Sequence, residues 1–246
     1  MKNVHSHNSS KKSVSITIPA FNEEKTIEKV AGEALAAVSK ITRDYELVLV
    51  DDGSIDKTGE IIDGLAKNNK YIKAFHHKKN RGFTGAMKTS IYSAKKHLVF
   101  FAPADGQFDF KELRNFIDAI KGYDVAIGYR EVREENIIRK FNSWGFHLLC
   151  KTLFGIPFKE FSSVILLHRK VIQSIKITSK DRSAMFFPEF LYNAVKKNYR
   201  FVEVPIYWHP RRGGRAKGAE IKTIYNTLKE MIRFWFQIRN TQHKMC

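Results

Sequence analysis

Acidic and polar residues that could bind a nucleotide follow two short apolar runs near the start of the chain. The runs read Ser15-Ile-Thr-Ile-Pro-Ala-Phe-Asn-Glu-Glu and Leu47-Val-Leu-Val-Asp-Asp-Gly-Ser-Ile-Asp-Lys-Thr. Each is rich in β-branched residues and stops at turn-forming residues, which is typical of a strand. Ligands of open α/β sheets bind at the carboxyl ends of the strands, so we expect Glu23, Asp51 and Asp52 to accept hydrogen bonds from ribose hydroxyls and base N–H groups. Asp-Asp-Gly-Ser alone also fits an ordinary β-turn.

Two further polar clusters follow the next two predicted strands. The first reads Asn80-Arg-Gly-Phe-Thr-Gly-Ala, and the second reads Phe100-Phe-Ala-Pro-Ala-Asp-Gly-Gln-Phe-Asp. In the first cluster Gly82 has no side chain, which allows the backbone to approach a nucleotide closely. In the second, Asp109 is placed to cap the helix that follows.

Strand-like and helix-like patterns alternate along the chain. The predicted strands are Val14–Ile18, Glu46–Val50, Ile72–Phe75, Leu98–Phe101, Val125–Ile127, Val164–Leu167 and Phe201–Ile206, and the predicted helices are Thr26–Val38, Thr58–Lys67, Gly85–Lys96 and Lys111–Ile120. This alternation predicts right-handed βαβ crossovers and an α/β fold with a mostly parallel sheet flanked by helices.

No repeat or low-complexity linker divides the chain of 246 residues. We expect a polar, disordered tail over residues 1–12 and one domain over 13–218. A basic amphipathic helix is expected over 219–246. The tail has no apolar segment of the kind found in signal peptides.

The formal net charge is +18, from 43 Lys and Arg against 25 Asp and Glu. Such a charge favours anionic partners: a nucleotide diphosphate, a lipid phosphate or an anionic membrane surface. Zinc-finger spacing, RNP-type aromatic motifs and a recognition helix are not evident, so we do not expect nucleic-acid binding. The two cysteines, Cys150 and Cys246, do not form a disulfide framework, which fits a reducing cytosol. The sequence contains no run of about 18 apolar residues, so we expect no transmembrane helix.

The joint order of these motifs resembles the family 2 glycosyltransferases of the GT-A fold, and most of all the branch of polyprenyl-phosphate (dolichol-phosphate) mannose synthases and glucosyltransferases. The resemblance runs from about Val14 to about Lys217, and it implies a nucleotide-binding half up to about residue 120 and an acceptor half after it. It depends on Pro-Ala-Phe-Asn-Glu, Asp-Asp-Gly-Ser-x-Asp-x-Thr, Asn-x-Gly, Ala-Asp-Gly-Gln and Arg-x-x-Gly-x-Ala-Lys occurring in this order. It implies that the donor nucleotide is bound by Pro19, Ala20, Asn22, Glu23, Asp51, Asp52, Ser54, Asn80, Gly82, Ala104, Asp105 and Lys217.

The resemblance also implies a divalent cation, Mg²⁺ or Mn²⁺. In the family a D-x-D motif binds the cation, followed in this branch by a glutamine. Here Pro103 stands at the first acidic position, which leaves Asp105 and Gln107 as the expected ligands. Mg²⁺ needs only one or two protein carboxylates because the diphosphate and waters complete its shell. The missing acid keeps open a non-catalytic homologue that only binds nucleotide sugars.

The same resemblance places arginines at the acceptor. Arg130 follows a Gly-Tyr pair where the branch has Gly-Ser-Arg, Arg139 borders the acceptor loop, and Arg211 begins the motif that ends at Lys217. With Asp105 these form the expected catalytic set. Guanidinium groups match phosphate geometry in a bidentate way. A phosphate acceptor is already ionised and needs no general base, whereas a hydroxyl acceptor would need one, for which Glu160 and Glu189 are candidates.

These features predict an inverting, metal-dependent glycosyltransferase. It would move a hexose, mannose or glucose, from GDP-mannose or UDP-glucose to polyprenyl phosphate in one in-line displacement. It would be cytoplasmic and peripheral on the cytosolic membrane face, alone, as a homo-oligomer or with a small membrane-protein partner. The alternatives are transfer to a saccharide hydroxyl during cell-surface polysaccharide assembly, and the binding-only homologue.

The segment from Ile221 to about Thr241 predicts a last helix with an apolar stripe. The stripe comprises Ile221, Ile224, Tyr225, Leu228, Met231, Ile232 and Trp235, and Lys222, Lys229, Arg233 and Arg239 flank it. A basic amphipathic helix rich in aromatic residues suits the surface of an anionic membrane. The same pattern also fits a helix packed on the sheet or on another protomer.

Overall fold

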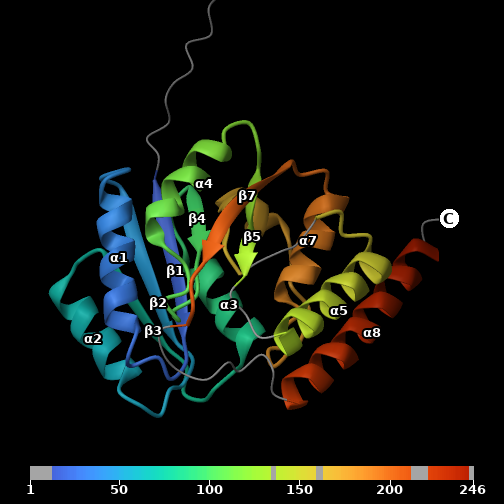
Figure 1. Ribbon diagram of the computed structural model, residues 1–246, viewed down its shortest axis with the longest axis horizontal. Helices are drawn as coiled ribbons and strands as arrows, with labels where there is room; N and C mark the ends of the chain where they lie inside the picture. The colour runs from blue at the N-terminus through green and yellow to red at the C-terminus, as the bar shows by residue number, and fades with distance from the viewer. Residues whose placement is uncertain (1–12, 134–136, 159–162, 212–220, 244–246) are drawn as a thin grey trace, which may run out of the picture.

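A computed structural model describes residues 13–133, 137–158, 163–211 and 221–243 (Figure 1). Its centre is a seven-stranded sheet in the order β3-β2-β1-β4-β6-β5-β7. The strands are β1 (Val14–Ala20), β2 (Tyr45–Asp51), β3 (Ile72–His76), β4 (Leu98–Phe101), β5 (Val125–Arg133), β6 (Ile165–His168) and β7 (Phe201–Trp208). Every predicted strand is present.

Most neighbouring strands are parallel, as predicted. The order β3-β2-β1-β4 is parallel throughout, and β5 is parallel to β7. Only β6 runs against its neighbours β4 and β5. The carboxyl ends of β1, β2 and β4 therefore lie at one edge of the sheet, where the polar motifs were expected.

The helices are α1 (Ile27–Ser39), α2 (Thr58–Asn68), α3 (Phe83–Ser93), α4 (Leu113–Ala119), α5 (Ile137–Phe154), α6 (Arg169–Ser174), α7 (Phe186–Lys196) and α8 (Ile221–His243), with a 3-10 turn, η1 (Phe110–Glu112), before α4. The first four helices lie close to their predicted positions. Asp109 caps η1 by accepting a hydrogen bond from the Lys111 N–H, as expected. The sequence did not predict α6 and α7.

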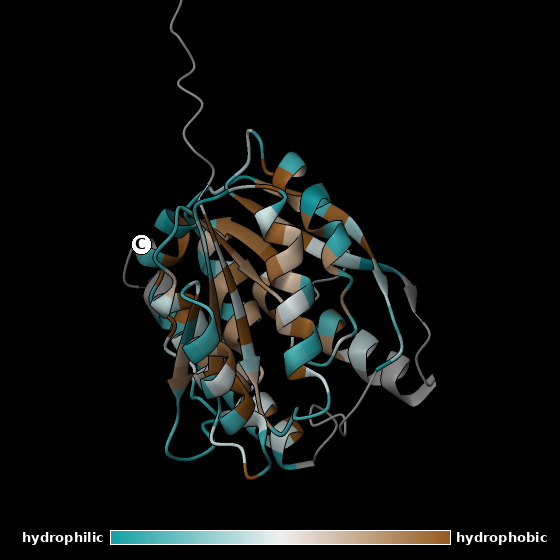
Figure 2. Ribbon diagram, turned by 90° about the vertical axis from the view of Figure 1, so that its left-hand side faces the viewer, coloured by the Kyte–Doolittle hydropathy of each residue, from teal (hydrophilic) through white to brown (hydrophobic). Residues whose placement is uncertain are grey.

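The two faces of the sheet carry separate hydrophobic cores, which β4 divides by alternation. Leu98 and Phe100 join a cluster that includes Phe116 of α4, whereas Val99 and Phe101 join a cluster that includes Phe186 of α7. Because helices cover both faces, the strands read as continuous apolar runs. In Figure 2 the strands are accordingly mostly brown.

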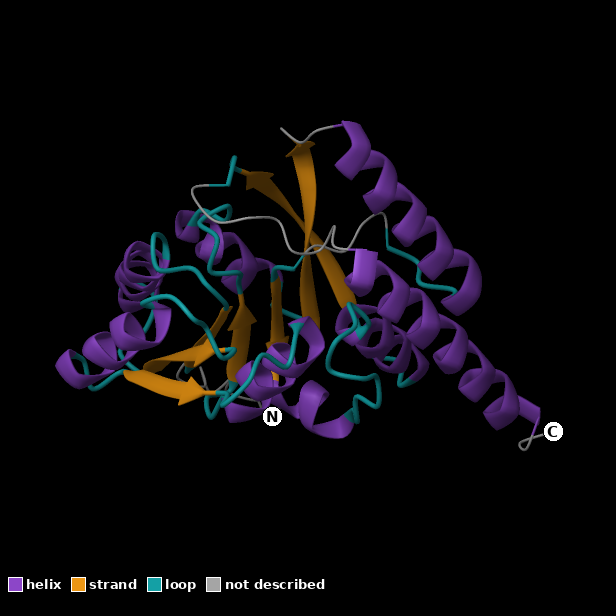
Figure 3. Ribbon diagram, turned by 90° about the horizontal axis from the view of Figure 1, so that it is seen from below, coloured by secondary structure: helices purple, strands orange, loops and turns teal. Residues whose placement is uncertain are grey.

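Helices α5 and α8 lie side by side on the outside of the second core (Figures 1 and 3). Met231 and Phe234 of α8 are buried in that core. On another side of the same helix Tyr225 is 63% exposed and Ile232 is 56% exposed. The helix therefore packs on the domain, as one alternative expected, and its outward apolar side chains leave binding to a membrane surface a prediction. No helix among the described residues is long and apolar enough to cross a bilayer.

Candidate functional site

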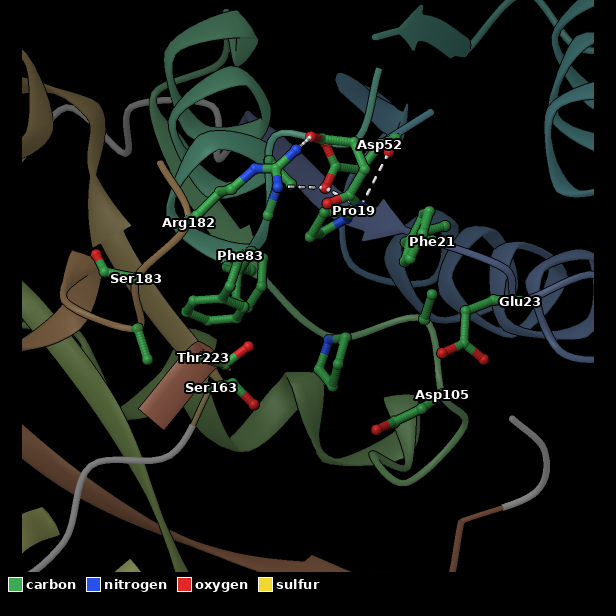
Figure 4. A pocket seen from close by; sticks show the side chains of 18 of the residues that line it. Pro19, Phe21, Glu23, Asp52, Phe83, Asp105, Ser163, Arg182, Ser183 and Thr223 are labelled. Atoms are coloured by element: carbon green, nitrogen blue, oxygen red, sulfur yellow. Dashed lines mark hydrogen bonds between the residues drawn. The ribbon is translucent and has the colours of Figure 1, made fainter. Parts of the chain in front are cut away.

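A pocket of about 480 Å³ opens at the carboxyl ends of β1 and β4, a size usual for small-ligand sites (Figure 4). It brings together nine of the residues expected from the sequence: Pro19, Ala20, Glu23, Asp52, Asn80, Gly82, Ala104, Asp105 and Arg211. The structure thus places around one cavity residues from the motifs expected to bind the donor and one from the motif expected to bind the acceptor.

The Asp52 carboxylate is buried and already holds four hydrogen bonds within the protein. Its Oδ1 accepts from the Arg81 N–H and lies 2.6 Å from His77 Nδ1. Its Oδ2 accepts from Asn80 Nδ2 and from the Gly82 N–H. A carboxylate has about four acceptor positions, so these contacts occupy it. Asp52 therefore shapes the 77–82 loop, and its contact with a nucleotide stays a prediction.

Three other expected donor-site residues hold loops and are not among the residues that line the pocket. Asn22 and Ser54 tie the loops after β1 and β2 together, because Ser54 Oγ accepts from the Asn22 N–H and Asn22 Oδ1 accepts from the Ile55 N–H. Asp51 accepts from the Ser54 N–H and contacts His76. These bonds fix the rim on which Pro19 and Ala20 lie.

Gly53 sits where this rim meets the 77–82 loop. Its φ is +69°, and an added Cβ would lie 2.7 Å from the backbone N of Asn80 and 2.7 Å from the carbonyl carbon of Lys79. A side chain at this position would therefore be strained and would overlap backbone atoms.

We expect Gly53→Ala to lower the free energy of unfolding by about 3 kcal/mol, the sum of left-handed strain and overpacking. Gly122→Ala is the matched control, since Gly122 has φ +83° but no atom within 4 Å of its added Cβ. The control should lose only about 1 kcal/mol, the cost of the backbone conformation. Urea unfolding measures both, and equal losses would contradict the role given to the loop contact.

Glu23, Asp105 and Arg211 meet at the other side of the pocket. Arg211 Nη2 donates to Glu23 Oε1 at 2.9 Å and lies 3.5 Å from Asp105 Oδ2. Glu23 is 7% exposed and the Asp105 side chain 13% exposed, so one guanidinium is shared by two shielded carboxylates. This is the only place among the described residues where the pocket joins two acids and an arginine.

Few protein groups at this site could bind a divalent cation. No group of three or more His, Cys, Asp or Glu that could hold a metal occurs among the described residues. Asp105 Oδ1 accepts from the Gln107 N–H, and Gln107 Nε2 donates to the carbonyl of His209. The buried Gln107 side chain thus holds the loop of Asp105 against the end of β7. A cation that draws most of its ligands from a diphosphate and water still fits Asp105.

None of the other residues expected at the acceptor is among the described residues that line the pocket. Arg130 lies on β5 outside the pocket lining, with its guanidinium 5.6 Å from the centre of the Trp208 ring. Arg139 belongs to the first turn of α5, and its side chain is outside the described part of the chain. Lys217 and Glu160 also lie outside the described residues. Only Arg211 of the three arginines lines the pocket, so their convergence stays a prediction.

Sequence reasoning missed the 178–184 loop, which forms another wall of the pocket. Arg182 lines the cavity and donates through Nη2 to the carbonyl of Asn80. An added Cβ on Gly82 would lie 3.0 Å from Arg182 Cα, so the space left by this glycine accommodates the 178–184 loop. The expected close approach is therefore made by protein backbone.

Ion pairs fasten this loop to α3 and to the loop before it. Asp181 accepts two hydrogen bonds from the Arg81 guanidinium and one from Lys88 Nζ. Partial burial raises the pKa of Asp181, but the bonds from Arg81 and Lys88 outweigh it and hold that pKa below its usual value. The loop is therefore anchored by a carboxylate that stays ionised near neutral pH.

Glu189, one of the two candidate general bases, has a structural role. It is 1% exposed, and its oxygens accept hydrogen bonds from the N–H and hydroxyl groups of both Thr178 and Ser179. It is not among the residues that line the pocket. With its acceptor positions taken by the protein, it is not placed to remove a proton from a substrate.

Helix α8 closes the pocket with Lys222, Thr223 and Asn226. The sequence predicted this helix but not its place at the pocket. The signal that could have linked it to the site is its closeness to Arg211 along the chain.

Comparison with known proteins identifies the family of this chain. Residues 15–220 match the family model described as Glycosyl transferase family 2. The chain belongs to this family. It is 28% identical over 215 residues to an undecaprenyl-phosphate 4-deoxy-4-formamido-L-arabinose transferase of Pectobacterium atrosepticum, a match that covers 87% of this chain and 64% of the relative. It is 24% identical to a dodecaprenyl-phosphate galacturonate synthase of Rhizobium johnstonii, covering 92% of this chain and 67% of the relative.

This member of glycosyl transferase family 2 thus spans a little under two thirds of the length of the arabinose transferases that it matches. Among solved structures it is similar to glucosyl-3-phosphoglycerate synthase from Mycobacterium tuberculosis, with a TM-score of 0.65, 16% identity, and coverage of 89% of this chain and 80% of that chain. That structure contains Mn²⁺ and UDP-glucose. The likeness confirms the GT-A fold expected from the sequence.

Proposed function

We propose that this protein is a glycosyltransferase that moves a sugar from a nucleotide diphosphate sugar to a polyprenyl phosphate. The observation that carries the proposal is the contact of Arg211 with Glu23 and Asp105 inside the pocket. Such a site offers one positively charged guanidinium and two shielded carboxylates next to a cavity large enough for a nucleotide sugar. The names of the relatives support polyprenyl phosphate as the acceptor class.

The chain's own groups supply binding and orientation. The Arg211 guanidinium can leave the carboxylates to pair with phosphate oxygens of donor or acceptor, because it matches both in geometry. The rim held by Asn22 and Ser54 would bind the nucleoside. If Mg²⁺ or Mn²⁺ binds, Asp105 would hold it, and the cation would offset charge on the departing diphosphate.

A phosphate acceptor agrees with the role of Glu189. A lipid phosphate is ionised near neutral pH and needs no base, whereas a saccharide hydroxyl does. Glu189 is fully occupied by Thr178 and Ser179, which removes one of the two candidate bases. In-line attack of the phosphate on the anomeric carbon would invert its configuration.

The test offers labelled UDP-glucose, GDP-mannose and UDP-galacturonate separately to the protein with Mn²⁺ and undecaprenyl phosphate, and in parallel with a soluble saccharide. We expect label in the organic phase with at least one donor. Label transferred only to the saccharide would favour the polysaccharide alternative. Donor binding without any transfer would support the binding-only homologue.

Docking on an anionic membrane face is the second part of the proposal. Four side chains on α8 at helical spacing are 44% to 63% exposed: Tyr225, Leu228, Ile232 and Phe236. On the neighbouring α5, Trp144 is 59% exposed. Exposed apolar side chains beside lysines suit the interface of an anionic bilayer, and such a position would bring a lipid phosphate to the protein.

We expect the double variant Leu228→Ser/Ile232→Ser to bind vesicles containing anionic lipid about tenfold more weakly, since each change removes apolar area from the interface. Ile55→Ser is the control, because Ile55 is 92% exposed but lies in the loop after β2. Vesicle co-sedimentation measures the partition. Unchanged binding of the double variant would argue against this face.

A further inference from the structure

Most polar side chains around the pocket are engaged within the protein, but three uncharged ones that line it make no hydrogen bond to the described residues. Asp52 and Asn80 bond to each other, and Ser183 Oγ donates to the Lys180 carbonyl. The side chains of Ser163, Thr223 and Asn226 make no hydrogen bond to any residue that the structure describes. These three offer hydroxyl and amide groups to a ligand.

The three side chains come from two elements and lie together on one wall. Thr223 and Asn226 are three residues apart on α8, which places them on one side of the helix. Ser163 precedes β6. Figure 4 shows Ser163 and Thr223 across the pocket from Asp105 and Glu23. Both α8 residues lie beyond residue 220, where the family match ends.

The chemistry of this wall differs from that of the wall facing it. Glu23, Asp105 and Arg211 are charged and suit a diphosphate with its cation. Hydroxyl and amide groups both donate and accept, which suits sugar hydroxyls. The sugar of a nucleotide diphosphate sugar is attached to the far phosphate, so it must lie beyond the charged wall from the nucleoside.

We propose that Thr223 and Asn226, together with Ser163, form the subsite that binds the transferred sugar and discriminates between sugars. The inference rests on the proposed function, and it adds the C-terminal helix to the specificity-determining part of the enzyme. A site built to hydrogen-bond a sugar hydroxyl rejects an analogue that lacks or misplaces it, because the buried polar groups are then left unpaired.

The test compares Thr223→Val and Asn226→Ala with the wild type by calorimetric titration. The probes are UDP and GDP alone, and UDP-glucose, UDP-galacturonate and GDP-mannose. We expect the Kd for the plain nucleotide to stay within about twofold, while the Kd for the best-bound sugar nucleotide rises about fivefold in each variant, the effect of one lost hydrogen bond. Thr223→Ser, which keeps the hydroxyl, should stay close to the wild type. Asn240→Ala, on the exposed far end of α8, is the matched control.

The outcomes separate the inference from the function. If the wild type bound neither UDP nor GDP, the proposed function would fail and the sugar subsite with it. If every sugar nucleotide bound no more tightly than its plain nucleotide, or if the variants weakened both equally, the subsite would be overturned and the function would stand. An increase in the KM for undecaprenyl phosphate with an unchanged donor Kd would assign this wall to the acceptor and would also overturn the inference.

Discussion

Asp105→Asn is expected to lower the rate of sugar transfer by about a hundredfold to a thousandfold and to leave the fold intact. Asp105 lines the pocket next to Arg211, and its side chain is 13% exposed. The amide keeps the shape but loses the charge that would hold a cation on the leaving diphosphate. Loss of one group that stabilises developing charge typically costs this much in kcat.

Steady-state transfer with undecaprenyl phosphate measures the effect, and thermal unfolding checks the fold. Asp118→Asn is the matched control, because Asp118 pairs with Arg114 and Lys121 on the exposed side of α4. Treating the wild type with a chelator should reproduce the loss, and Mn²⁺ should reverse it. Activity of Asp105→Asn within twofold of the wild type would contradict a role for this carboxylate.

Glu189→Ala is expected to lower the free energy of unfolding by about 3 to 4 kcal/mol. The change leaves the backbone N–H groups of Thr178 and Ser179, and both hydroxyls, without their acceptor. Ser179 is fully buried, and each buried donor left unpaired costs about 1 to 3 kcal/mol, part of which relaxation recovers, whereas Thr178 is exposed and its groups can bond to water. Because these residues begin the 178–184 loop, Arg182 at the pocket should also become less ordered.

Urea unfolding measures the loss, with Glu60→Ala on the exposed side of α2 as the control. Glu189→Gln separates a structural role from a catalytic one. If Glu189 only holds the loop, the folded fraction of this variant keeps most of its activity toward a phosphate acceptor. Complete inactivity of a stably folded Glu189→Gln protein would instead favour a general base and hence a hydroxyl acceptor.

The α8 helix joins the second core, the pocket and the exposed apolar face. Thr227 Oγ1 accepts from the Ala184 N–H, and Glu230 accepts from the Lys180 N–H. These two bonds tie the helix to the same loop that Glu189 and Asp181 hold. A sugar subsite on α8 would therefore be positioned by contacts that also fix the 178–184 loop at the cavity.

Elements missed from the sequence have identifiable physical causes. Helix α7 begins with six consecutive buried residues, Phe186–Leu191, and this run includes Pro188, which is tolerated only in the first turn of a helix, so the run does not read as a helix in the sequence. Helix α6 has only six residues, too few to show a period. In α8 the predicted apolar stripe is largely exposed, because part of the packed face is the polar pair Thr227 and Glu230, which bond to a distant loop.

The amino-acid sequence by itself determined the strands, the parallel α/β architecture and the acids at the strand ends, since these depend on local periodicity and on short motifs. Only the tertiary structure decided which of those side chains remain available to a ligand. Asp52 and Glu189 look alike as free acids in a sequence, yet partners up to 30 residues away occupy the carboxylate of Asp52, and Thr178 and Ser179 occupy that of Glu189. The placement of α8 and the 178–184 loop around the pocket likewise depends on long-range packing, which no local pattern encodes.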